Sequence, residues 1–330
     1  MLDERWPEDV ADLSAGLRSL LEKACGTEVV RAAESSEEGR DPALEEKLDA
    51  FGLWDLPNNA AMLAAASWET GRALAPIPYP ERATVLGALG IRDASYGLEG
   101  AVPVPPSKTV VQGADGDVLL ADVLAPGRRT SAGDLLAEAP IEGSVVGDTD
   151  TGRRMRALAR LLYAARLTGA AERMLEAGVE HVKGRTQFGK PIGSFQAVAH
   201  RLADAAIALD GATLLVRKTA WVFVQGGDEV QAQAFAPMVW AKAVDTGRLV
   251  ASAVHQVMGG YGFTLEEDIQ LYGRRIRSWT MRLPSPDPEL AMLARMMLDP
   301  QRRDAIVHLW QFDKGIQLPR WATEADAGRG

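Results

Sequence analysis

Apolar residues recur at three- and four-residue spacing along much of the chain, which is the pattern of helices that bury one face. In the first part of the sequence this spacing predicts helices at residues 8–25, 42–54 and 58–75, with a polar, Glu-rich loop between the first two. The helical pattern ends in "ALAPIPYPERA", where Pro76, Pro78 and Pro80 remove backbone donors. The N-terminal region is therefore predicted to be helical.

The pattern changes between about residues 102 and 145. Short β-branched runs alternate with turn signals, and Gly113-Ala114-Asp115-Gly116 separates "TVV" from "VLL". We expect three to five strands here. Such a segment is too short to form an independent sandwich or barrel, so it should pack on the helices around it.

Helical spacing returns after Asp148 and predicts long helices at 151–183, 192–225, 230–258 and 265–277. Short Gly-containing links between long helices favour an antiparallel bundle. The last stretch, "QLPRWATEADAGRG", is expected to be a frayed tail. One apolar stripe within the second of these helices is formed by Phe195, Val198, Leu202, Leu209 and Val216.

Composition narrows the functional classes. The formal net charge of -9 argues against a general nucleic-acid surface. Cys25 is the single cysteine, so the chain has no internal disulfide, and the N-terminus lacks an apolar signal region. No apolar run of membrane-spanning length is present, and the histidines lack metal-ligand spacing. We predict a cytoplasmic protein without a metal site.

The first cluster of special residues is "GRTQFGKPIGSFQAVAHRLADAA", residues 184–206. Arg185 has two interpretations: a surface charge near a helix end, or a planar fork for a phosphate or pyrophosphate, with amide hydrogen bonds from Gln187 and Gln256. Phe188 and Phe195 would flank an apolar face of the same ligand. The spacing alone does not choose between these interpretations.

The second cluster is "HQVMGGYGFTLEEDIQLYGRRIRSW", residues 255–279, where Gly259, Gly260 and Gly262 interrupt a helical pattern. Each glycine inside a helix would cost about 1 kcal/mol, so a turn is favoured. The turn is either a helix C-cap followed by a loop or a place where backbone approaches a ligand closely.

In this order and spacing, the two clusters resemble the acyl-CoA dehydrogenase family. The family's "R-x-Q-F-G-x-P-I-x-x-F-Q-x-x-x-H-x-L-A-D" is matched by Arg185, Gln187, Phe188, Gly189, Pro191, Ile192, Phe195, Gln196, His200, Leu202, Ala203 and Asp204. Its "Q-x-x-G-G-x-G-F" and "LYxR" are matched by Gln256, Gly259, Gly260, Gly262, Phe263, Leu271, Tyr272 and Arg274.

The resemblance implies a mainly α fold with N-terminal helices at 1–92, a reduced central β domain at 93–149 and a C-terminal four-helix bundle at 150–330. It also implies FAD, bound across a subunit interface. Arg185 would contact the pyrophosphate, Phe188 and Gln196 would line the adenosine end, and backbone at Gln256, Gly259 and Gly260 would close on it.

The departures from the family are informative. The family's "A-x-T-E-P-x-A-G-S-D" stretch and the "W-I-T/S" strand after it are absent, and "SYGLEGAVPVPPSKTVVQGADGDVLL" stands in that region. The family's catalytic glutamate occurs at one of two places, which here hold Arg282 or Leu283 and Ala159. None of these side chains can accept a proton from carbon. Glu266 and Glu267 are nearby acids for which we expect a solvated or capping role.

These departures resemble the short, base-lacking subunits of heteromeric α2β2 acyl-CoA dehydrogenases that act on steroid side chains. The resemblance therefore implies no catalytic residue in this chain and a flavin shared with a partner subunit. That partner would carry the isoalloxazine, the base and most of the acyl-CoA. Two alternatives stay open: a homomeric enzyme with an unrecognised base, and a scaffold subunit without a catalytic role.

Overall fold

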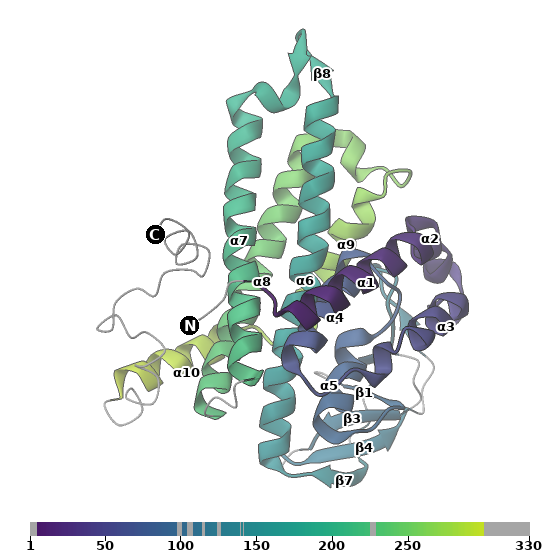
Figure 1. Ribbon diagram of the computed structural model, residues 1–330, viewed down its shortest axis with the longest axis vertical. Helices are drawn as coiled ribbons and strands as arrows, with labels where there is room; N and C mark the ends of the chain where they lie inside the picture. The colour runs from purple at the N-terminus through teal and green to yellow at the C-terminus, as the bar shows by residue number, and fades with distance from the viewer. Residues whose placement is uncertain are drawn as a thin grey trace, which may run out of the picture.

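A computed structural model describes residues 5–97, 101–103, 108–113, 116–123, 127–138, 140, 142–224 and 229–299. Long helices form an upright bundle, and the N-terminal helices and the strands lie along one side and the lower end of it (Figure 1). The predicted mainly α fold is confirmed. The predicted frayed tail lies outside the described residues.

The N-terminal helices begin at recognisable caps. Asp41 accepts a hydrogen bond from the backbone N–H of Leu44, and Asn59 accepts from Ala61 and Met62. The elements are α1 (Glu8–Ala24), α2 (Thr27–Ser35), α3 (Pro42–Ala50), the 3-10 helix η1 (Leu53–Asp55), α4 (Ala60–Arg72) and α5 (Tyr79–Leu89).

Two predictions for this region were wrong. Helix α2 occupies much of the segment that was expected to be a loop, and α5 begins inside the proline-rich stretch. Pro80 lies in the first turn of α5, where a missing backbone N–H removes no intrahelical hydrogen bond. Helix α2 buries Val30 and Ala33, so its position depends on tertiary contacts that a local pattern does not contain.

Between residues 94 and 147 the described residues form seven short strands, more than the three to five expected. One sheet has the order β1-β3-β4-β7 and the other the order β2-β6-β5. Among these described strands, only β1 and β3 pair in parallel. The strands are β1 (Ala94–Tyr96), β2 (Ala101–Pro103), β3 (Lys108–Gln112), β4 (Val118–Asp122), β5 (Arg128–Arg129), β6 (Leu135–Glu138) and β7 (Ser144–Gly147).

The predicted turn between β3 and β4 is present. Gln112 pairs with Val118, and the backbone N–H of Gly113 donates to the carbonyl of Asp117. Gly116 has φ +86°, a conformation that glycine adopts at little cost. Residues 114 and 115 of this turn lie outside the described residues.

The C-terminal elements agree with the long helices predicted by the apolar spacing, although the second begins at Gln196 rather than Ile192 because residues 192–194 form a 3-10 turn. Helix α10 was not predicted. The elements are α6 (Thr149–Gly184), η2 (Ile192–Ser194), α7 (Gln196–Val224), α8 (Glu229–Met258), η3 (Gly259–Phe263), α9 (Ile269–Trp279) and α10 (Asp287–Leu298).

Helix α6 is the central helix, and α4 crosses it at backbone distance. A Cβ atom on Gly169 would lie 2.2 Å from the carbonyl oxygen of Trp68, and one on Gly71 would lie 2.1 Å from that of Arg166. The hydroxyl of Ser67 donates to the carbonyl of Leu162 at 2.6 Å. This crossing fixes the N-terminal helices against the bundle.

The predicted domain limits at 92/93 and 149/150 stay predictions, as does the cytoplasmic location. The nearest structural features are the last strand, which ends at Gly147, and α6, which begins at Thr149. Within the described residues, no helix combines the length and the apolar character needed to cross a membrane.

Candidate functional site

The first sequence cluster forms a hairpin at the end of α6, projecting from the top of the bundle in Figure 1. Strands β8 (Thr186–Gln187) and β9 (Lys190–Pro191) pair antiparallel. The two residues between them, Phe188 and Gly189, have φ +53° and +78°, as a tight two-residue hairpin turn requires. The backbone N–H of Ile192 donates to the carbonyl of Arg185 at 2.8 Å and closes the base of the hairpin.

The aromatic residues predicted to flank a ligand lie side by side on this hairpin. Phe188 is 91% exposed, and its ring meets the ring of Phe195 edge-on with centroids 6.1 Å apart. The ammonium of Lys190 lies 4.4 Å from the centroid of the Phe195 ring. A phenylalanine held at positive φ and almost fully exposed is costly in an isolated subunit, so the hairpin offers an apolar surface to another molecule.

The polar residues of the predicted site are also free to bind. Arg185, Gln187, Gln196 and Gln256 are all exposed. Within the described part of the chain, no hydrogen bond or ion pair engages any of their side chains. Donors and acceptors that satisfy no internal partner are available to an anionic or polar ligand.

The geometry of the glycine turn is compatible with both interpretations that the sequence left open. Gly259 follows the last residue of α8 with φ +61°, which is the left-handed conformation of a helix C-cap. At the same time, a Cβ atom on Gly259 or Gly260 would meet nothing within 4 Å. The backbone there is open to close approach by a ligand.

The structure brings Arg185 and two residues beside the glycines of the second cluster, Met258 and Tyr261, to one groove. The ring of His181 stacks on that of Tyr261 with centroids 5.9 Å apart, which joins the end of α6 to η3. A groove of about 1320 Å³ is lined by Arg185 from the first cluster and by Met258 and Tyr261 from the second. The other predicted site residues do not line this groove: Gln187, Phe188, Phe195, Gln196, Gln256, Gly259 and Gly260.

Charges in the groove single out Arg185. Arg18, Arg72 and Arg173 also line it, but each is paired with a glutamate. Arg72, for example, donates to Glu172 at 2.8 Å and to Glu176 at 2.6 Å. Arg185 is thus the groove arginine whose guanidinium has no partner among the described residues.

Sequence reasoning missed His181 and Tyr261, which form a wall of the groove. His181 stands four positions before Arg185, about one helical turn, and Tyr261 lies inside the glycine cluster, so position alone could have suggested them. A hydrogen bond with Glu267 raises the pKa of Tyr261. Glu267 is therefore engaged with the groove wall, while Glu266 is exposed.

The two positions at which the resemblance places a catalytic glutamate do not line the groove beside Arg185. Ala159 is fully buried in α6, and Leu283 is buried after α9. Arg282 forms an ion pair of 3.1 Å with Asp134, which precedes β6. These positions present a methyl group, an isobutyl group and a paired guanidinium, and none can accept a proton.

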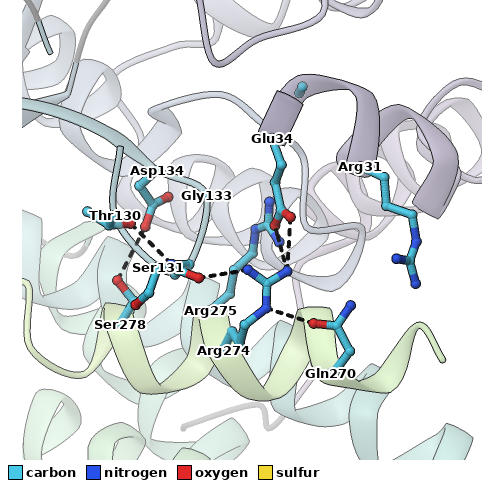
Figure 2. A network of polar contacts seen from close by, with 12 residues as sticks. Arg31, Glu34, Thr130, Ser131, Gly133, Asp134, Gln270, Arg274, Arg275 and Ser278 are labelled. Carbon is cyan, nitrogen blue, oxygen red and sulfur yellow. Dashed lines mark hydrogen bonds and ion pairs between the residues drawn. The ribbon is translucent and has the colours of Figure 1, made fainter. Parts of the chain in front are cut away.

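A polar network holds α9 against α2 and the β5–β6 loop (Figure 2). Glu34 accepts from Arg274 at 2.9 Å and from Arg275 at 2.5 Å. Arg274 also donates to Gln270 and to the carbonyl of Ser131. The network fixes α9, the helix that follows the glycine turn. Its partners lie far apart in the sequence, so no local motif predicts the network.

Comparison with known proteins relates both the C-terminal part and most of the whole chain to proteins of one family. Residues 154–282 match the family model described as "Acyl-CoA dehydrogenase, C-terminal domain". Acyl-CoA dehydrogenase IpdE2 of Mycobacterium tuberculosis is 29% identical, over 87% of this chain and 96% of the relative.

Two solved structures share the fold at low identity. The ChsE4-ChsE5 complex from Mycobacterium tuberculosis has a TM-score of 0.80 at 21% identity, covering 90% of this chain and 99% of that chain. A variant of the Tcur3481-Tcur3483 steroid acyl-CoA dehydrogenase has a TM-score of 0.78 at 22% identity, covering 91% of this chain and 98% of that chain.

Proposed function

Since this chain belongs to the acyl-CoA dehydrogenase family, we propose that it is one subunit of an FAD-dependent acyl-CoA dehydrogenase. It supplies the ADP-binding half of a flavin site to a partner subunit that carries the catalytic glutamate. When bound, FAD accepts the hydride in the α,β-dehydrogenation of an acyl-CoA thioester. The family implies FAD for the enzyme as a whole; the sharing of FAD between subunits is our proposal.

One observation carries this proposal: the predicted half-site is exposed and has no internal partners. Arg185 offers five N–H donors to anionic oxygens, and a pyrophosphate is the part of FAD that such a fork fits. The open backbone at Gly260 leaves room for close approach. Phe188 and Phe195 supply an apolar face beside these polar groups.

The chain's lack of a base favours a partner. Ala159, Arg282 and Leu283 occupy the positions where the family resemblance places the glutamate, so the proton acceptor would come from another chain. The solved ChsE4-ChsE5 structure, one chain of which shares this fold, is of a complex of two proteins, which supports a heteromer. The Tcur3481-Tcur3483 protein is a steroid acyl-CoA dehydrogenase, and we propose a steroid side-chain CoA as the substrate class here.

Co-expression tests the subunit role. The chain would be purified alone and together with a long-chain acyl-CoA dehydrogenase candidate, and bound flavin and acyl-CoA oxidation would be measured for both. We expect flavin and turnover only in the complex. Stoichiometric FAD and turnover from the isolated chain would refute the heteromer and favour a homomeric enzyme with an unrecognised base.

The Arg185→Ala variant tests the half-site within the complex. Losing a charge-assisted hydrogen bond costs about 1.5–3 kcal/mol, so FAD should bind about 10- to 150-fold more weakly. Arg154→Ala is the matched control, because Arg154 is an exposed arginine in the first turns of α6, remote from the hairpin. Its FAD affinity should be unchanged.

Gln256→Ala gives a second measure of the same half-site, with a smaller expected loss because a neutral amide makes weaker hydrogen bonds. Partner co-purification should persist in every variant. Unchanged FAD affinity in both Arg185→Ala and Gln256→Ala, with an intact complex, would remove the proposed cofactor role. That result would favour the scaffold alternative.

A further inference from the structure

His255 is the first residue of the second cluster and stands in the last turn of α8. The family motif begins only at the next residue, Gln256, and Gly273 occupies the variable position of "LYxR". The resemblance therefore gives no role to His255 or to Gly273. In the structure these two residues pack against each other beside the glycine turn.

The half-buried ring of His255 is held on several sides. Its face stacks on the ring of Phe263, with centroids 4.6 Å apart and an angle of 18° between the planes. Its Nε2 edge faces Gly273 of α9, where a Cβ atom would collide with Nε2 and lie 3.0 Å from Cε1. A Cβ atom on Gly262 would lie 3.4 Å from Nδ1. The imidazole therefore fills the space between α8, η3 and α9.

Gly273 is an unfavourable residue for its place in the helix. It lies inside α9, where glycine is a poor helix former and alanine would be preferred. The three atoms nearest to a Cβ atom on Gly273 all belong to His255. The close approach of the imidazole therefore accounts for a glycine at this position.

The helix against which His255 packs is itself anchored. Arg274, the residue after Gly273, donates to Glu34 of α2 at 2.9 Å and to the carbonyl of Ser131 at 2.7 Å (Figure 2). Both partners lie far from α9 in the sequence. A ring wedged between this anchored helix and η3 fixes the position of η3 relative to α9.

The glycine turn needs such support, because glycine has more backbone freedom than any other residue. The space beside the first two glycines is open, so support comes from aromatic residues that follow them. Tyr261 lies on His181 at the end of α6, and Phe263 lies on His255. The second stack is the one that links the turn to α9.

His255 acts on the turn by packing and not by charge. Burial lowers the pKa of its imidazole, so the ring is neutral near pH 7 and offers no positive charge to a phosphate. Its face and its Nε2 edge are already covered by Phe263 and Gly273. Any effect of His255 on a ligand must therefore pass through the backbone that it holds.

We propose that His255 is a positioning residue of the flavin half-site, which holds the glycine turn in the conformation that receives the ligand. This role rests on the proposed function, because the ligand is the ADP part of FAD. A turn that is ordered before binding avoids the entropy cost of ordering it during binding. Fixing the backbone of one residue corresponds to about a 5- to 30-fold change in affinity.

Amide hydrogen exchange on the full chain tests the support of the turn without flavin. Peptides covering residues 256–264 should exchange faster in His255→Ala and in Gly273→Ala, whose methyl group would displace the imidazole. Gly211→Ala is the matched control, because Gly211 lies in α7 and its Cβ atom would meet the flexible end of Lys242. Unchanged exchange of these peptides in His255→Ala would overturn the proposal.

Titration of the flavin-free complex with FAD, followed by flavin fluorescence, tests the consequence for binding. FAD should bind His255→Ala at least about 5-fold more weakly, Gly273→Ala similarly, and Gly211→Ala as tightly as the unchanged protein. The double variant of His255 and Gly273 should bind FAD like His255→Ala alone, because the ring that collides with the new methyl group is gone. Losses that multiply in the double variant would show independent effects and overturn the proposal.

Two comparisons separate this role from stability and from the half-site itself. A lower melting temperature of His255→Ala with unchanged FAD affinity would make His255 a stabilising residue only and refute its positioning role. If Arg185→Ala weakens FAD and His255→Ala does not, the positioning role alone fails. If neither weakens FAD, the half-site fails.

Phe263→Ala removes the same stack from its exposed side and keeps the role testable if His255→Ala does not fold. Phe263 is 68% exposed, so its replacement should leave the fold intact. FAD should again bind at least about 5-fold more weakly. Unchanged FAD affinity in a folded Phe263→Ala complex would refute support of the turn by the stack.

Discussion

Replacing Glu34 with alanine should destabilise the protein strongly, because this side chain ties α2 to α9 (Figure 2). Arg275, which donates to Glu34, has only 5% of its side chain exposed, and the Glu34 side chain is 16% exposed. Breaking a buried ion pair by removing one partner costs about 3–5 kcal/mol, since the remaining charge stays buried without compensation. Arg274 would keep its hydrogen bonds to Gln270 and Ser131, so we expect the lower end, about 3 kcal/mol.

Urea unfolding followed by tryptophan fluorescence and circular dichroism would measure this loss. Glu38→Ala is the matched control: Glu38 is exposed and pairs with Arg40 at the surface, so its replacement should cost no more than about 1 kcal/mol. A double-mutant cycle with Arg275→Met would isolate the coupling between the two charges. Equal losses in Glu34→Ala and Glu38→Ala would refute the stabilising role of the network.

Two further predictions concern the groove and its neighbourhood. Gly260→Val should leave the melting temperature unchanged, because its Cβ would meet nothing within 4 Å. The valine side chain should nevertheless lower FAD affinity in the complex, because it would occupy the space through which a ligand approaches the backbone. A large loss of thermal stability with unchanged FAD affinity would contradict this prediction. Burial raises the pKa of the Cys25 thiol to about 12, so the thiol of the native protein should resist an aromatic disulfide reagent at about pH 8 and react once the protein is unfolded in urea. Rapid reaction of the native protein would show that the thiol is accessible.

The long helices were predictable because their signal is local. Helices α6 and α8 are about ten and about eight turns long, and their observed limits differ from the predicted ranges by at most two residues. Helix α2 is only nine residues long, too short for the apolar spacing to repeat over several turns. It is held by contacts with remote residues, among them the pairing of Arg31 with Asp268, which local spacing cannot contain.

The sequence suggested residues for the candidate site but not the shape of that site. Arg185 shares a groove with Met258 and Tyr261 of the second cluster, whereas Gly259 and Gly260 do not line it. Whether Phe188 points into the groove or away from it depends on the two-residue turn of the hairpin, which residue types alone did not specify.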